Sequence, residues 1–83
     1  MRFIAEIDVM PLKTLLDPQG KAVYMSMHNL GFDNVKNVRI GKHISVEMEA
    51  SNKEKAGQLI TELCRKILSN PVIEDFHYNI NPL

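Results

Sequence analysis

Apolar and polar side chains alternate in four stretches of the chain, and this period of two is typical of half-buried strands. The stretches are residues 2–9, 35–40, 43–49 and 72–80. In the first of them the apolar side is formed by Phe3, Ala5, Ile7 and Val9. Gly41-Lys42 separates the two middle stretches and suits a two-residue type II′ turn. The pattern therefore predicts four strands, of which the middle two form a hairpin.

A first helix is predicted between residues 17 and 30. The Asp17 carboxylate can accept an N–H of the first turn, and Pro18 at the first helical position loses no needed donor. Gly31 supplies a left-handed stop after Leu30. The loop before this helix, residues 10–16, is unusually apolar for a surface connection.

A second helix is predicted from a capping box, in which Ser51 caps the first turn and Glu54 reaches back. Its apolar stripe consists of Ala56, Leu59, Ile60, Leu63, Cys64 and Ile67. Asn70-Pro71 ends the helix, because the residue before a proline avoids helical geometry.

The resulting order, β-α-β-β-α-β, predicts a ferredoxin-like α+β sandwich in which both helices cover one face of a four-stranded antiparallel sheet. Residues 1–83 form a single domain, since the chain is too short for a second core. The other face of the sheet is then polar with an acidic lean. Its expected members are Arg2, Ile4, Glu6, Asp8, Arg39, His43, Ser45, Glu47, Glu49, Ile73, Asp75 and His77.

Charge and cysteine content indicate the cellular compartment and the classes of partner to expect. Ten Lys and Arg balance ten Asp and Glu, so the overall charge does not favour nucleic acid or an anionic membrane. The N-terminal residues 1–10 are neither a signal-peptide core nor part of a membrane span. The single cysteine, Cys64, has no partner for a disulfide. We expect an unprocessed, cytoplasmic protein, and a small domain of zero net charge that associates with partners.

No catalytic, cofactor-binding or metal-binding residue is predicted. The two strands that would bind RNA bases in a fold of this kind contribute only one aromatic residue, Phe3, on the buried side. The first loop has no cysteine for metal transfer, and no histidine is paired with a nucleophile by any motif. Cys64 lies on the apolar stripe of the second helix and behaves there as a small hydrophobe. Four carboxylates, Glu6, Asp8, Glu47 and Glu49, could face one another, and a solvated face is a better interpretation than an ion site.

The best candidate for a partner interface is the loop before the first helix. Leu12, Leu15 and Leu16 stand in a short connection that has no core of its own. Gly20 could let a partner approach the start of the helix, or it could be a tolerated glycine in a capped turn. A binding module is therefore favoured over an enzyme.

Several segments together resemble the PurS family, the small subunit of phosphoribosylformylglycinamidine (FGAM) synthase. The matching segments are Leu16-Asp17-Pro18-Gln19-Gly20-Lys21-Ala22-Val23, Val38-Arg39-Ile40-Gly41-Lys42-His43-Ile44, Glu47-Met48-Glu49-Ala50 and Asn70-Pro71-Val72-Ile73-Glu74-Asp75-Phe76. Each motif alone is weak, but their combination and order are specific, and the resemblance covers nearly the whole chain.

The resemblance implies a subunit of a ligase that has no active site of its own. Such a subunit bridges the synthetase subunit PurL and the glutaminase subunit PurQ in purine biosynthesis. The complex uses ATP, magnesium and glutamine to convert formylglycinamide ribonucleotide into formylglycinamidine ribonucleotide, and this chain binds none of them. The resemblance also implies a homodimer that can pair into a tetramer, through strand edges or the polar sheet face, with no nucleic-acid or membrane partner.

The residues at the matching motifs are the predicted interface. Together with the two leucines of the first loop they are Leu15, Leu16, Asp17, Gly20, Arg39, Gly41, Lys42, Asn70, Pro71 and Glu74. We hypothesise that Arg39 and Lys42 contact a partner, because a hairpin tip needs neither charge for folding; a turn with a solvated lysine is the structural alternative. The alternative function is a regulatory module of the ACT type, which shares the element order and binds a small molecule such as an amino acid.

Overall fold

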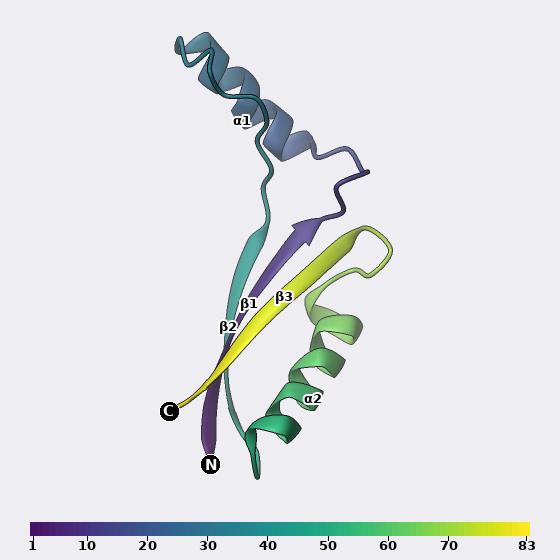
Figure 1. Cartoon of the computed structure of the whole chain (residues 1–83). Helices are drawn as coiled ribbons and strands as arrows, with labels where there is room; N and C mark the ends of the chain where they lie inside the picture. The colour runs from purple at the N-terminus through teal and green to yellow at the C-terminus, as the bar shows by residue number, and fades with distance from the viewer.

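A three-stranded antiparallel sheet in the order β2-β1-β3 forms the centre of the computed structural model, which describes all of residues 1–83 (Figure 1). The strands are β1 (Arg2–Pro11), β2 (Lys42–Glu49) and β3 (Glu74–Pro82). Because β1 is the central strand, its inward side chains are the most deeply buried. They are Phe3, Ala5, Ile7 and Val9, all at most 2% exposed. The alternation in residues 2–9 predicted this strand correctly.

One helix, α2 (Lys53–Leu63), covers the apolar face and continues into the wider turn η1 (Cys64–Leu68). It packs on β1 and β3 through a fully buried stripe of Ala56, Ile60 and Cys64. The predicted stripe is confirmed for these three residues, but Leu59 and Ile67, which were predicted on it, are 40% and 72% exposed. The N-cap of α2, however, is Asn52, whose side chain accepts a hydrogen bond from the N–H of Lys55 at 2.9 Å. The assignment of the cap to Ser51 was therefore wrong by one residue.

The other helix, α1 (Pro18–Asn29), lies beyond the end of the sheet instead of on its face (Figure 1). It is followed by a turn at Gly31, which has the positive φ of 96° that the sequence predicted for a stop. Residues 32–40 then return along the helix to the sheet. We call residues 18–40 the arm; it accounts for much of the 51 Å length of the molecule. The expectation that both helices cover the sheet was wrong.

The prediction of a fourth strand over residues 35–40 was also wrong, and with it the hairpin at Gly41-Lys42. This segment forms hydrogen bonds with α1 and with the residue that precedes that helix. His28 Nε2 lies 3.1 Å from the carbonyl oxygen of Val35, and the N–H of Ile40 donates to Asp17. Lys42 already pairs with Val9 as the first residue of β2. The apolar residues at 35, 38 and 40 therefore do not mark a sheet face, and Arg39 does not lie on the open face.

The last strand begins two residues later than predicted. Residues 70–73 form a turn, in which Val72 is 77% exposed and not inward-facing. Ile73 lies in the same turn and thus not on the open sheet face. The remaining predicted members of that face sit on it, since cross-strand partners such as Asp8 and His43, or Asp8 and His77, share one side of an antiparallel sheet.

Part of the apolar face lacks a cover within this chain. The inward side chains of β2, which are Ile44, Val46 and Met48, are only half-buried. In a two-helix sandwich the first helix would lie over them, whereas here α1 belongs to the arm (Figure 1). No helix is long and apolar enough to cross a membrane.

Candidate functional site

The two ends of the arm are held together at its base by one carboxylate. Asp17 accepts the N–H of Gly20 on Oδ1 at 3.0 Å and the N–H of Ile40 on Oδ2 at 2.8 Å. The bonds from Gly20 and then from Ile40 hold the pKa of Asp17 below its usual value. One side chain thus caps α1, as predicted, and also fixes the end of the returning segment. We call the region around this carboxylate, where β1 ends and the arm begins and returns, the junction.

Close packing at the junction explains both of its glycines. A Cβ on Gly20 would overlap the carbonyl oxygen of Val38, and a Cβ on Gly41 would overlap the carbonyl oxygen of Val9. Arg39 adds a further tie, since its guanidinium donates to the carbonyl oxygen of Pro11. The reasoning that Arg39 is not needed for folding therefore fails, because it joins the arm to β1. Its contact with a partner stays a prediction.

The two leucines before α1 form the wall of an apolar cavity of about 560 Å³. Leu15 is 42% exposed and Leu16 is 76% exposed. Ile40 and Ile73 line the same cavity, together with Pro18. The cavity opens at the end of the sheet from which the arm departs.

The turn before β3 joins the same region. Glu74 accepts the N–H of Asn70 at 2.8 Å, and the Asn70 side chain accepts the N–H of Val72 at 3.1 Å. The N–H of Leu12 donates to the carbonyl of Ile73 at 2.9 Å and so ties this turn to the loop after β1. The ten predicted interface residues, which are far apart in the sequence, thus gather near the end of the sheet from which the arm departs.

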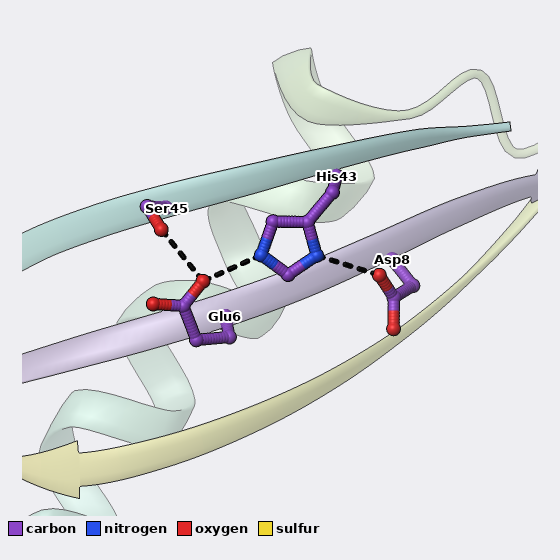
Figure 2. Close-up of polar contacts among 4 residues, drawn as sticks. All are labelled: Glu6, Asp8, His43 and Ser45. Atoms are coloured by element: carbon purple, nitrogen blue, oxygen red, sulfur yellow. Dashed lines mark hydrogen bonds and ion pairs between the residues drawn. The ribbon is translucent and has the colours of Figure 1, made fainter.

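A second polar group, not predicted from the sequence, lies on the open face of the sheet. The ring of His43 is placed between two carboxylates, 2.7 Å from Asp8 and 2.5 Å from Glu6 (Figure 2). Ser45 donates to the same Glu6 oxygen at 2.6 Å. Because carboxylates accept on both sides, both ring nitrogens donate, as in the charged imidazolium. Alternation placed all four side chains on one face, but only the register Asp8 opposite His43 brings them together.

These bonds shift two pKa values in opposite directions. The hydrogen bond to Asp8, then that to Glu6, raises the pKa of His43. The hydrogen bond from Ser45, then that from His43, lowers the pKa of Glu6. The imidazolium of His43 therefore offsets part of the acidic charge of Glu6 and Asp8. All four side chains are solvent-accessible, and the group contains no nucleophile next to a free base.

No group of three or more His, Cys, Asp or Glu side chains in the chain has the geometry to hold a metal ion. Cys64 is fully buried, and burial raises the pKa of its thiol, which disfavours the reactive thiolate. The largest cavity, about 690 Å³ along α2 next to Thr61 and Tyr78, contains none of the predicted interface residues.

Comparison with known proteins decides the family. A family model described as PurS, phosphoribosylformylglycinamidine (FGAM) synthase, matches residues 4–82. The chain belongs to the PurS family. It is 38% identical over 71 residues to the FGAM synthase subunit PurS of Methanocaldococcus jannaschii, covering 86% of each chain. It is 40% identical over 68 residues to PurS of Bacillus subtilis, covering 82% of this chain and 80% of that one.

Solved PurS structures have the same fold. The crystal structure of Methanocaldococcus jannaschii PurS superposes with a TM-score of 0.86 at 32% identity, covering 98% of both chains. A chain in the structure of PurLQS from Thermotoga maritima superposes with a TM-score of 0.84 at 35% identity, covering 100% of this chain and 99% of that one. The resemblance to PurS predicted from the sequence motifs is confirmed. Nothing in these comparisons supports the ACT-type alternative.

The packing at Gly20 predicts a substitution effect. Gly20→Ala should destabilise the fold by about 1–3 kcal/mol, because the new methyl group must displace the backbone at Val38. Gly57→Ala is the matched control, since its Cβ would meet only ordinary contacts with Tyr78 and Ile80 at 3.6 and 3.8 Å. Alanine within α2 should then be neutral or stabilise the fold by up to about 1 kcal/mol. Urea unfolding measures both, and equal effects would contradict the packing described here.

The His43 group predicts a pH-dependent contribution to stability. A raised pKa makes the His43 contribution present below its ordinary value of 6.5 and lost as the pH rises through the raised value. A lowered pKa makes the Glu6 contribution present above 4.5 and lost as the pH falls. The stability difference between the unmodified chain and His43→Gln should therefore be largest between these two pH values. Urea unfolding across the pH range tests this.

The control for His43 is His77→Gln. His77 lies opposite Asp8 on β3 but forms no ion pair with it. Its substitution should change stability little between pH 4.5 and 6.5, the range set by the ordinary values of Glu6 and His43. A His43→Gln difference that does not vary with pH would show that the two carboxylates do not hold the ring.

Proposed function

We propose that this chain is the non-catalytic bridging subunit of a multi-subunit FGAM synthase, placed between the PurL synthetase and the PurQ glutaminase. Membership in the PurS family makes it a subunit of FGAM synthase in purine biosynthesis. The observation that carries the bridging role is the close superposition on a chain of the PurLQS structure. The expected compartment is the cytoplasm, where the buried free thiol of Cys64 stays reduced.

The chemistry of the complex explains why a bridge is useful. Ammonia released from glutamine at one subunit must reach a second site, where ATP and magnesium activate the formylglycinamide ribonucleotide. Fixing the two subunits in one orientation raises the effective concentration of ammonia at the second site. The contribution of this chain is rigid placement, and the carboxylate of Asp17 supplies that rigidity at the junction.

We place the partner interface at the junction and its apolar cavity. It is formed by the predicted set Leu15, Leu16, Asp17, Gly20, Arg39, Gly41, Lys42, Asn70, Pro71 and Glu74. Within this set Asp17, Gly20 and Gly41 shape the surface, whereas Leu16 and Lys42 are exposed and free to make contact. An exposed leucine beside an apolar cavity is the kind of position that an interface covers.

The interface predicts that Leu16→Asp weakens assembly. Removing one buried leucine from a contact costs about 1.5–3 kcal/mol, or roughly tenfold or more in affinity. Ile67→Asp is the control, because Ile67 is similarly exposed, 72% against 76%, and lies on η1 away from the junction. Calorimetry with purified synthetase and glutaminase subunits measures both variants. Equal affinities for Leu16→Asp and the unmodified chain would place the interface elsewhere.

We further propose that the chain forms a homodimer, which can pair into a tetramer. The half-buried side chains of β2 lack a cover, while Met25, Leu30 and Phe32 of the arm are 55–76% exposed. An arm from a second copy can supply the missing cover, and a two-fold axis satisfies both copies at once. This contact replaces the strand edges and the polar face as the preferred dimer surface.

The dimer predicts a change in mass on modification of the arm. Phe32→Asp should shift the chain toward monomer, because a carboxylate cannot be buried against the apolar side chains of β2. Ile67→Asp should remain a dimer. Sedimentation equilibrium over a range of concentrations measures the mass of each. An unmodified chain that is monomeric throughout, or a fully dimeric Phe32→Asp, would contradict the proposed contact.

A further inference from the structure

A basic groove lies at the base of the arm, next to the apolar cavity, with which it shares Leu15, Leu16 and Asp17. Its volume is about 320 Å³, and it lies between α1 and residues 36–39. The basic side chains that line it are Lys13, Lys21, Lys36 and Arg39, and its apolar lining consists of Leu15, Leu16, Tyr24 and Val38. The cations come from the loop after β1, from α1 and from the returning segment. They lie together only once the arm has folded against this loop.

The positive charge of this groove is only partly offset within the chain. None of the three lysines forms an ion pair in the structure, whose pairs are all at Arg2, His28, His43 and Lys66. The only carboxylate in the lining is Asp17, whose charge interacts with Arg39, so four cations share a single anion. Arg39 uses one guanidinium nitrogen for Pro11 and keeps other donors free.

This concentration of charge contrasts with the neutral balance of the chain. Four of its ten cations line one groove. The open sheet face carries the opposite excess, with Glu6, Asp8, Glu47, Glu49 and Asp75 against Arg2 and the imidazolium of His43. Like charges held together repel one another unless a ligand of opposite charge offsets them. The groove therefore has the electrostatics of a site for an anionic group.

The residues that line the groove indicate which kind of anion it binds. Half of the lining residues other than Asp17 and Asn37 are apolar or aromatic. A small inorganic anion would leave these side chains uncovered, whereas a peptide segment with interleaved acidic and apolar residues covers both kinds. Lysines make contacts without a fixed geometry and suit carboxylates on a flexible segment.

We propose that the basic groove binds an acidic segment, rich in Asp or Glu with interleaved apolar residues, of one of the two partner subunits. This inference rests on the proposed bridging function and adds the chemistry of one contact to it. The acidic sheet face remains free to orient the complex, because opposite charges on two surfaces of one chain favour a single docking orientation.

The test compares two triple variants with the same loss of charge. Lys13→Gln, Lys21→Gln and Lys36→Gln remove the lysines of the groove, while Lys53→Gln, Lys55→Gln and Lys66→Gln remove three cations on α2 and η1. Both variants are measured for binding a fluorescent heptapeptide, Glu-Glu-Leu-Glu-Glu-Leu-Glu, and for assembly with the synthetase and glutaminase subunits. A peptide with Gln in place of each Glu, and 10 mM inorganic phosphate as a competitor, complete the design.

The groove variant should bind the acidic peptide at least tenfold more weakly than the unmodified chain and should lose affinity for one partner subunit. The α2 variant should match the unmodified chain in both measurements. Equal losses in both variants, binding of the Gln peptide, or displacement of the acidic peptide by phosphate would overturn the proposal. Normal assembly of the groove variant would overturn it while leaving the bridging function intact. Groove-dependent peptide binding without assembly of the unmodified chain would instead support the groove and overturn the bridging function.

Discussion

The two hydrogen bonds accepted by the Asp17 carboxylate are the constraint on which the functional end of the molecule depends. One oxygen begins α1 at Gly20, and the other ends the returning segment at Ile40. The arm begins and ends at this point. Because the carboxylate binds both the start of α1 and the end of the returning segment, it sets the direction in which the arm projects. Leu15 and Leu16 precede the carboxylate directly, and their place between the apolar cavity and the basic groove follows from the same bonds.

A second constraint follows from the direction of the arm. A sheet with a single helix on its apolar face cannot cover all three strands, and the inward side chains of β2 stay half-buried. A chain of 83 residues has little core to compensate for this. In the dimer proposed above, the arm of a second copy covers the apolar side of β2. Association and folding are then linked, since both bury the same side chains.

The features of the fold that the sequence predicted correctly depend on short-range interactions. The alternation of β1, the cap at Asp17, the stop at Gly31 and the burial of Cys64 each depend on a few neighbouring residues, and each was predictable. Residues 35–40 were not, because apolar positions at a spacing of two or three fit an added strand and a segment on a helix equally well. The motifs supplied the residues that we predict at the interface, but only the folded chain shows that Gly20 and Gly41 are required by backbone contacts.

The distribution of charge over the surface also depends on the fold and could not be predicted from the sequence. A net charge of zero argued against electrostatic recognition, because a sum over the chain cannot show where the charges lie. The fold separates them: β1, β2 and β3 bring carboxylates to one sheet face, and the arm brings lysines to a groove. At physiological salt, charges act over about 8 Å, so a partner at the groove responds to its local positive charge and not to the neutral total. A neutral chain can therefore present two surfaces of opposite sign, and a bridging subunit that must distinguish two partners has a physical use for both.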